Sequence, residues 1–272
     1  MPKQNSQQIA AAVQNPMQQL VDKYSIPRRV LTVDRLPSGA MPIYDSNGSV
    51  ILINESVQTA VRHGARVEIP TVEITTNFSV NIAAFQLMTL EDIGRRITVT
   101  VENDLITRED DLFFELLKAS ESTCQRDSSI IRDLNEFNEV IFSAAINIEK
   151  YDIRPQFLIC NEKQQKFFSH LMINHGLEMI PSKLCDSNTF YILPSKETFG
   201  TVLIRQDLTC VPTDNPIEAS LGWAFFEIIG MALFNPKYLV KHEFVYRGQD
   251  KFKSKYDYFE KSWKEEDEVT VA

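Results

Sequence analysis

The chain has 272 residues, a formal net charge of −9 and a sequence pI near 5.1. Its 43% hydrophobic and 24% charged residues are typical of an ordinary globular protein, which excludes wholesale disorder. Binding to nucleic-acid backbones requires clustered Lys and Arg, and no window of the sequence supplies a basic patch of useful size. Tight, direct DNA binding is therefore not expected.

Cysteine use and the N-terminus indicate where such a chain is made. There is no Cys-x-x-Cys pair, which argues against a zinc site, and the wide spacing gives no disulfide framework, as in a reducing cytosol. The first residues lack the apolar core of a signal peptide, and no run of eighteen apolar residues occurs. We expect a soluble, intracellularly made protein with no membrane span, no metal and no cofactor. The cysteines are Cys124, Cys160, Cys185 and Cys210.

Residues 1–40 form a Gln-rich N-terminal arm. Apolar residues recur at helical spacing from Ile9 to Val21, and Pro27 and Pro37 bracket an irregular stretch. The apolar stripe is thin, so we expect a helix that is marginal alone and docks onto another surface.

Residues 41–82 predict an extended hairpin. Asn47-Gly48 lies between apolar runs at 43–44 and 50–53 and is a strong hairpin-turn signal. Polar and apolar residues alternate over 66–69, Pro70 breaks the register, and the alternation resumes one residue out of phase over 72–82.

The hairpin region is poor in large side chains. Residues 45–77 contain no Phe, Tyr or Trp, although aromatic residues make up 10% of the chain. A two-stranded ribbon without a third layer is barely stable in water, so these strands either fold back onto the body or lie on a neighbouring subunit. We favour the neighbouring subunit, because the apolar alternation is present but the bulk for an internal core is not.

Residues 88–120 carry two conflicting signals. The segment 96–101 has strand composition, but a longer set of apolar residues falls three and four apart on one helical face. Helical spacing of apolar residues over that length outweighs the strand propensity of a six-residue segment, so we expect a long helix. Thr107–Asp110 resembles a capping box that opens or restarts a helix. The helical set is Leu90, Ile93, Ile97, Val101 and Leu105.

The remaining segments predict a mixture of helix and strand. A second helix is expected over about 129–151, beginning after Asp127-Ser128-Ser129 and ended by Pro155. Residues 157–159 indicate a short buried strand, and Asn161 is a credible cap for a helix ending near Gly176. Strands are also expected over 189–193 and 201–204. The charged tail from residue 247 onward fits either a peripheral helix or a mobile strap.

The apolar segment 220–240 is long and aromatic, yet Glu227, Gly230 and the turn at Asn235-Pro236 interrupt it. It is too short and too interrupted for a membrane span. We expect two adjacent core strands, within 221–244, joined by a tight Asn-Pro corner.

Candidate chemical sites are weak. His170 and His175 lie five apart, not at the i, i+4 spacing that suits a metal, and Cys124 has no identifiable His partner. Asp110-Asp111 is most simply charge at a helix start, and the Trp223/Phe225/Phe226 group is core material rather than a base-stacking platform. His63 and His242 are isolated. We expect no enzymatic activity.

The order of the segments is more informative than any one of them. It runs from a hairpin carrying 67–74, through a long helix containing Arg95-Arg96 and the segment 108–114, to a helix ending at 148–152, and then to 211–216 and 222–237. This order resembles that of the Hong Kong 97-like major capsid proteins of tailed bacteriophages, over about residues 40 to 244. The fold implied is an α+β fold with an N-terminal arm, an extended hairpin (the E-loop), a P-domain with a long spine helix and an A-domain.

The resemblance assigns each part of the chain. It implies an arm at 1–40, an E-loop at 41–82, a P-domain at 83–152 and 216–246, an A-domain at 153–215 and a charged tail at 247–272. The arm and the E-loop would reach over neighbouring subunits, and the A-domain would cluster at five-fold and six-fold positions.

The resemblance also raises one chemical activity of the family. The member that gives the fold its name joins a hairpin lysine to an asparagine of the closing segment, helped by a buried glutamate. Here Glu227 matches the glutamate, but Ser220 stands at the asparagine position, and no lysine occurs between Lys23 and Lys118. Isopeptide cross-linking by this route is therefore excluded, and Glu227 is expected to be a structural carboxylate, paired with an Arg or Lys or solvated.

The resemblance implies a major capsid protein that self-assembles, as pentamers and hexamers, into an icosahedral shell around double-stranded DNA. Such a shell would form in the host cytoplasm, enclose DNA without sequence-specific binding and take scaffold, portal or decoration proteins as possible partners. An encapsulin-type compartment shell and, further off, a small-oligomer α+β enzyme stay open as alternatives. The predicted subunit interface is Val67, Ile69, Pro70, Val72 and Ile74.

Overall fold

The computed structural model describes residues 2–37, 40–46, 48–54, 58–63, 66–165, 176–213 and 219–246. It divides the chain into two compact units. Unit 1 comprises Met1–Thr123 and Ser195–Pro236, and unit 2 comprises Cys124–Pro194 and Lys237–Ala272. The subdivision into arm, E-loop, P-domain and A-domain stays a prediction.

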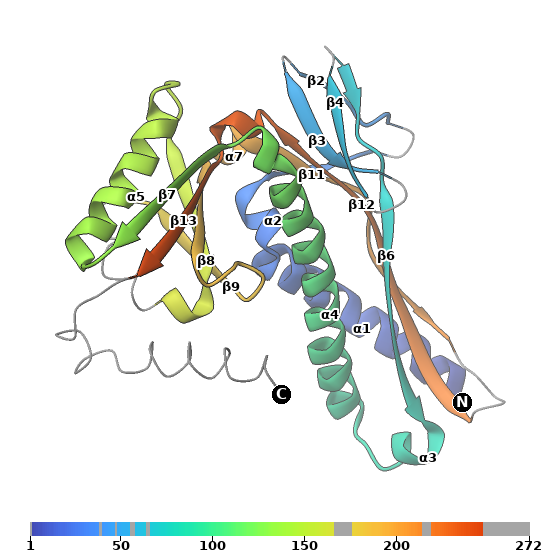
Figure 1. The fold of residues 1–272 in the computed structure, drawn as a ribbon. Helices are drawn as coiled ribbons and strands as arrows, with labels where there is room; N and C mark the ends of the chain where they lie inside the picture. Colours follow the sequence, from blue (N-terminus) through green and yellow to red (C-terminus); the bar gives the residue numbers. More distant parts are fainter. Residues whose placement is uncertain are drawn as a thin grey trace, which may run out of the picture. The chain divides into compact units, whose positions relative to one another are not determined.

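Unit 1 combines a long helix with a large sheet (Figure 1). Its elements are α1 (Pro2–Tyr24), α2 (Ile26–Val30), β1 (Thr32–Arg35), β2 (Ile43–Asp45), β3 (Ser49–Ile53), β4 (Thr59–His63), β5 (Arg66–Glu68), β6 (Val72–Asn81), α3 (Ile82–Phe85), α4 (Leu90–Ala119), the 3-10 turn η1 (Ser120–Ser122), α7 (Lys196–Phe199), β11 (Gly200–Pro212) and β12 (Ser220–Phe234).

The sheet of unit 1 is organised around β12. The strand order is β1-β11-β12-β3-β4. Along the other edge of β12, β6 pairs with its first ten residues and β3 pairs with its last three residues, 232–234. Residues far apart in the sequence are thereby joined in one sheet, since β1 and β3 come from the first 53 residues. Burial of the mostly apolar β12 among these partners contributes hydrophobic stabilisation to this unit.

The long helix of unit 1 is confirmed. α4 covers thirty residues, a length of about 45 Å, and the side chains of Ile93, Ile97, Val101 and Leu105 are all buried. Its N-cap is Thr89, whose hydroxyl accepts a hydrogen bond from the Asp92 amide. The predicted restart near Thr107 is wrong, because the helix continues through this residue.

The predicted turn pairing of the hairpin region is wrong. β2 pairs with β5, not with β3, because both edges of β3 are occupied by β4 and β12. Residues 50–53 of β3 are fully buried, so this strand lies inside the sheet of its own chain. Asn47, at the predicted turn, lies outside the described residues.

The expectation that the aromatic-poor strands lack a core of their own is also wrong. Val67 and Ile69 pack in a cluster with Val50, Leu52, Leu203 and Ala232 from three other strands of the same unit. Aliphatic side chains supplied by β3, β11 and β12 replace the missing aromatic bulk. Part of this packing comes from β11 and β12, whose residues Leu203 and Ala232 lie more than 130 positions from Val67 and Ile69 in the sequence.

The described residues of unit 2 form a five-stranded sheet with the helix α5 packed against it. Its strand order is β7-β13-β10-β8-β9, with β7 parallel to β13 and β8 parallel to β9. Its core gathers Phe137 and Ile141 of the helix against Phe190 and Phe244 of the sheet. The elements are β7 (Gln125–Ile131), α5 (Leu134–Glu149), β8 (Pro155–Asn161), the 3-10 turn η2 (Glu162–Gln164), β9 (Glu178–Ser182), β10 (Thr189–Pro194) and β13 (Val240–Tyr246).

The second helix starts later than predicted. Residues 125–131 form strand β7, and Asp133 is the N-cap, accepting from the amides of Asn135 and Glu136. The strand at 157–159 and the capping role of Asn161, which accepts from the Lys163 amide, are confirmed. The expected helix up to Gly176 falls largely on 166–175, which lie outside the described residues, as do His170, His175 and the tail from 247 onward.

The apolar segment near the C-terminus does form two strands, but they are not neighbours in a sheet. β12 belongs to the sheet of unit 1 and β13 to the sheet of unit 2. Asn235 has a φ of 55° and is followed by the 3-10 turn η4 (Pro236–Tyr238), so the corner redirects the chain instead of folding it back into a hairpin.

No helix among the described residues is long and apolar enough to cross a membrane.

Candidate functional site

Glu227 lies in the middle of β12 and is completely buried. A carboxylate in that position requires a partner, because its transfer out of water costs several kcal/mol. The partner is Arg28, whose Nη2 lies 2.5 Å from Glu227 Oε2. The sequence prediction of a structural carboxylate paired with a cation is confirmed.

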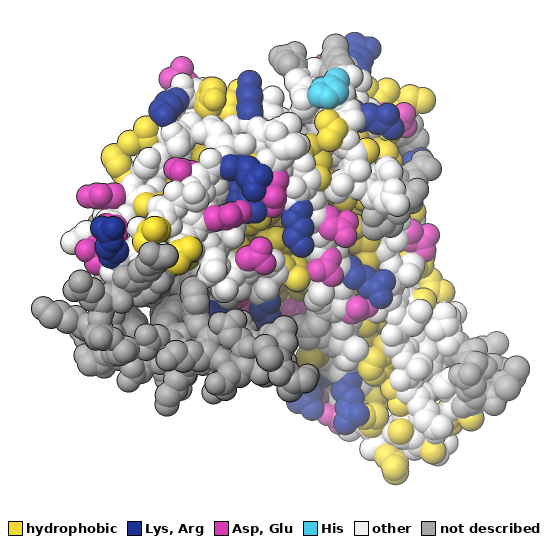
Figure 2. All heavy atoms as spheres, in the orientation of Figure 1, with side chains coloured by type: hydrophobic (Ala, Val, Ile, Leu, Met, Phe, Trp, Pro, Cys, Tyr) yellow, Lys and Arg dark blue, Asp and Glu magenta, His cyan; other side chains and the backbone are white. Residues whose placement is uncertain are grey.

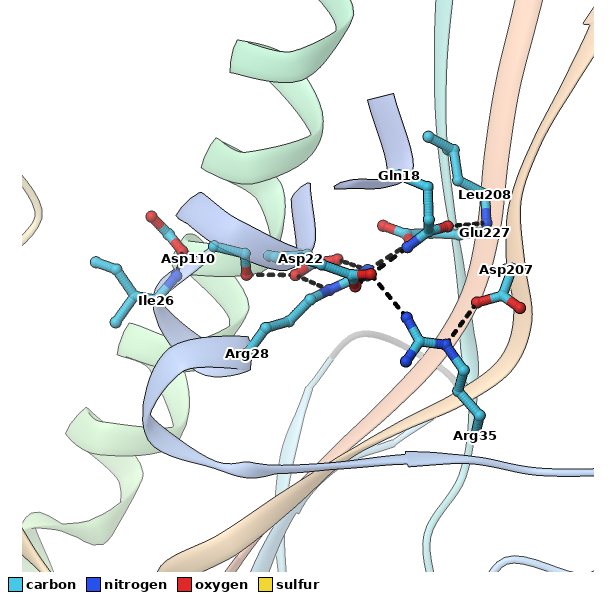
Figure 3. A network of polar contacts seen from close by, with 11 residues as sticks. Gln18, Asp22, Ile26, Arg28, Arg35, Asp110, Asp207, Leu208 and Glu227 are labelled. Carbon is cyan, nitrogen blue, oxygen red and sulfur yellow. Dashed lines mark hydrogen bonds and ion pairs between the residues drawn. The ribbon is translucent and has the colours of Figure 1, made fainter. Parts of the chain in front are cut away.

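Arg28 reaches Glu227 from the short helix α2. Its guanidinium is also fully buried and donates to Glu109 through both Nε, at 3.0 Å from Oε2, and Nη2. Nη1 donates to Asp22 Oδ1 at 2.7 Å. Figure 3 shows Arg28 directed at this group of carboxylates, and we call Arg28, Glu109 and Glu227 the buried ion cluster.

The turn between α1 and α2 adds two further contacts to α4. Ser25 Oγ donates to Glu109 Oε2, and the backbone amide of Ile26 donates to Asp110 Oδ1 at 2.8 Å. Glu109 and Asp110 lie within α4, about two thirds of the way along it. The prediction that Asp110 marks a helix start is therefore wrong: this carboxylate receives the first amide of α2.

Burial and like charge shift the proton affinities of this site. Burial, followed by the nearby negative charge of Glu109, raises the pKa of Glu227 well above its usual range. Burial raises the pKa of Asp110 to about 7. Burial opposes the charge of Arg28, but Glu109 and Glu227 outweigh that effect, and the pKa of Arg28 rises.

A polar rim connects the cluster to the surface. Arg35 of β1, about half exposed, donates to Asp22 Oδ2 at 2.8 Å and to Asp207 Oδ1 at 3.0 Å (Figure 3). Gln18 of α1 donates to Asp22 and accepts from the amide of Leu208 at 2.7 Å. The rim joins α1, β1 and β11.

Helix α1 is docked on its own chain along most of its length. Met17 and Val21 are fully buried, and the helix packs on α4 and β11. Gln14 accepts from the amide of Cys210, just after the segment 204–209 where the register between β11 and β12 shifts. The indole Nε1 of Trp223 donates to the carbonyl of Ser6 at 3.0 Å. The predicted docking of this helix is confirmed, and the surface that receives it belongs to the same subunit.

The residues that the family's isopeptide cross-link requires do not stand at the matching positions. Ser220 begins β12 where the family has its asparagine, and no lysine lies between Lys23 and Lys118, so the cross-link by the route described above lacks its amine. Among the described residues no group of three or more His, Cys, Asp or Glu side chains is placed to hold a metal ion. Trp223 and Phe225 are fully buried core residues, as predicted.

Four of the five predicted interface side chains do not lie on the surface. Within their own chain these four side chains are each at most 6% exposed; they are Val67, Ile69, Val72 and Ile74. Their predicted role as intersubunit contacts is therefore corrected: they are core residues of their own subunit. Pro70 is half-buried. The exposed part of this region lies elsewhere, on β2 and β4.

The outer strands of the hairpin expose apolar side chains. Met41, Ile43 and Val61 are 76%, 48% and 46% exposed. β4 is almost wholly exposed, and its pairing within the described residues is with β3 alone. Figure 2 shows hydrophobic, basic and His side chains together at this end of the visible face. The basic part includes Arg62 and Arg66, which line a shallow cavity of about 370 Å³.

A scan against protein-family models gives no match, and no curated protein matches the sequence. Solved structures do match the fold. A virus-like particle protein from Pyrococcus furiosus superposes with a TM-score of 0.60 at 16% identity, covering 86% of this chain and 98% of that one. The capsid of Cyanophage P-SCSP1u superposes with a TM-score of 0.55 at 11% identity, covering 80% of this chain and 87% of that one. The holo-SrpI encapsulin of Synechococcus elongatus superposes with a TM-score of 0.52 at 11% identity, covering 79% of this chain and 85% of that one. The chain therefore has the Hong Kong 97-like capsid fold, as the segment order predicted.

Sequence reasoning found Glu227 but missed Arg28 and Glu109. A glutamate inside an apolar strand signals that a buried cation exists somewhere in the chain. It does not say which of the 28 Lys and Arg residues supplies it. The one local sign in the sequence that Arg28 is buried was that apolar residues, Ile26 and Val30, lie two positions to either side of it.

Proposed function

We propose that this protein is a shell-forming subunit that assembles with copies of itself into a closed, icosahedral particle and catalyses no reaction. The observation that carries the proposal is the fold, because its solved neighbours are a virus-like particle, phage capsids and an encapsulin. A closed shell built from many equal contacts gains its stability by repetition, so each contact can be weak and errors can dissociate before closure.

The exposed hairpin surface supports this proposal. Met41, Ile43 and Val61 are exposed among the described residues and would be shielded from water by another molecule, and the edge of β4 that no described strand occupies offers backbone groups to an incoming strand. In this arrangement the hairpin acts as the E-loop and reaches a neighbouring subunit through β2 and β4, while its inner strands belong to the core of their own subunit.

We infer that the shell is held without covalent cross-links. The closing segment has Ser220 in place of an asparagine, and Glu227, the matching glutamate, is engaged by Arg28. Shell strength would then come from noncovalent contacts and from partners such as scaffold, portal or decoration proteins.

Two kinds of shell fit the fold. One is the head of a tailed phage, formed in the host cytoplasm and enclosing double-stranded DNA without sequence-specific contacts. The other is an encapsulin-type compartment, supported by the likeness to the holo-SrpI encapsulin, which superposes with a TM-score of 0.52 over 79% of this chain. Particles purified from the native source distinguish them: nuclease-protected DNA supports the phage head, and an enclosed protein supports the compartment.

A matched pair of valine substitutions tests assembly through the hairpin. Val61→Asp places a charge on the exposed strand β4, so we expect a folded subunit that forms no particles in sedimentation velocity or electron microscopy. Val67→Asp places the same charge in the subunit core, so we expect loss of the fold itself. Particles of normal size from V61D would contradict the proposed contact surface.

A further inference from the structure

The buried ion cluster has more carboxylates than cations. Arg28 is the one guanidinium among Glu109 and Glu227, and all three side chains are inaccessible to solvent. In addition, Glu227 Oε1 is buried without a hydrogen-bond partner among the described residues. A net negative charge in such a site is strongly unfavourable, and the simplest group that neutralises it is a proton.

The buried ion cluster attaches the segment 25–28 to the body of unit 1. Arg28 donates to Glu109 of α4 and to Glu227 of β12, and the hydroxyl of Ser25 donates to Glu109. Further along α1, Gln14 and Gln18 accept from amides of β11, and Trp223 donates to the carbonyl of Ser6.

We propose that residues 2–30 form a proton-gated clasp, which stays docked while one proton is bound between Glu109 and Glu227 and opens as that proton is lost on raising the pH. The clasp is a property of the single subunit and does not depend on shell formation. Opening would expose the side of α4, β11 and β12 that Met17 and Val21 cover.

The charges around the site favour proton retention. On the acidic side, Glu109, Asp110 and Asp111 come from α4, Glu227 from β12 and Asp22 from α1. On the basic side, Arg28 is fully buried, Arg29 lies near Asp110, and Arg35 is shared between Asp22 and Asp207 at the rim.

Hydrogen bonding and charge act in the same direction on Glu227. Its pKa is raised by burial, by the charge of Glu109 and by a hydrogen bond between the two carboxyl groups, while Arg28 opposes these effects. The pKa of Asp110, about 7, adds a second proton that the open form would release at lower pH. Docked subunits therefore bind more protons than open ones, and opening is promoted as the pH rises.

Hydrogen exchange of the amides of residues 9–30 measures the opening. The protection factor is followed from pH 5 to pH 10 in the full chain. Each proton released on opening should lower protection about tenfold per pH unit until the docked form itself ionises. We expect the protection factor to fall by up to a factor of 100 per pH unit below pH 7 and by about a factor of 10 per pH unit above it, until the docked form ionises. No slope in this range would overturn the proposal.

Three matched variants assign the proton. The Glu227→Gln side chain stays neutral at every pH, so the fall of the protection factor should be weaker by about a factor of 10 per pH unit. Asp110→Asn should remove the additional fall of the protection factor below pH 7. Glu73→Gln makes the same charge change at an exposed position of β6 and should leave the slope unchanged. An E227Q slope equal to that of the unsubstituted chain would overturn the assignment.

A spectroscopic measurement covers the case in which E227Q fails to fold. In the D110N chain at pH 7, infrared difference spectra should contain the C=O stretch of a protonated, buried carboxylic acid that disappears as the clasp opens at higher pH. Absence of this band at pH 7 would also overturn the proposal.

Discussion

Replacement of Arg28 by methionine tests how strongly the ion cluster stabilises unit 1. The substitution keeps a long, apolar side chain but removes the donors to Glu109, Glu227 and Asp22. Three buried oxygens lose a donor, at about 1–3 kcal/mol each. Ser25 still donates to Glu109, and Glu227, whose pKa burial raises, can take up a proton, so the cost should fall toward the lower end of that sum. We expect a loss of about 3–5 kcal/mol in the free energy of unfolding.

The assay is urea denaturation followed by the fluorescence of Trp223, which is buried in unit 1 and bonded to Ser6. Trp263→Phe removes the second tryptophan, so the midpoint reports unit 1 alone. The control is the triple variant R28M/E109L/E227L, which removes all three charges and should be much closer to the unsubstituted chain in stability. A loss below about 1 kcal/mol for R28M alone, the range of exposed ion pairs, would refute the claim that the cluster is a buried anchor.

Three further substitutions follow from the packing and protonation of unit 1. A Cβ at Gly230 would lie 2.6 Å from the carbonyl oxygen of Pro70, so G230A should lower the free energy of unfolding by about 1–3 kcal/mol in the same urea assay. A Cβ at Gly94 in α4 would meet Val13 at an ordinary 3.7 Å, so G94A should raise that free energy by up to about 1 kcal/mol, and a loss there would contradict the close docking of α1. Because the pKa of Asp110 is about 7, the native chain holds a proton that the unfolded chain releases, and the free energy of unfolding should fall by up to about 4 kcal/mol between pH 4 and pH 7. D110N should remove this part of the pH dependence, and an unchanged profile would argue against burial of that carboxyl.

Local patterns predicted the elements whose evidence lies within them. The spacing of Ile93, Ile97 and Val101 identified α4 despite its strand-like composition, since these side chains occupy the buried face of the helix. The capping role of Asn161 and the strand that precedes it were equally local.

The pairing partners could not be found in this way. Whether Val67 lies on the surface or in a core depends on β11 and β12 as well as on β3, and nothing in residues 41–82 reports the presence of β11 and β12. The same holds for Arg28, whose two glutamate partners are 81 and 199 positions away. Contacts over such distances are decided by tertiary packing, which also turned residues 125–131 into a strand beside β13.

The most direct test of the proposed function is the mass of the purified full-length chain, measured by sedimentation velocity over a range of concentrations and compared with electron micrographs of the same sample. A shell-forming subunit should give closed particles of megadalton mass, or rings and clusters of the kind from which they are built. A single species of 31.2 kDa at every concentration, with no particles in the micrographs, would contradict the account.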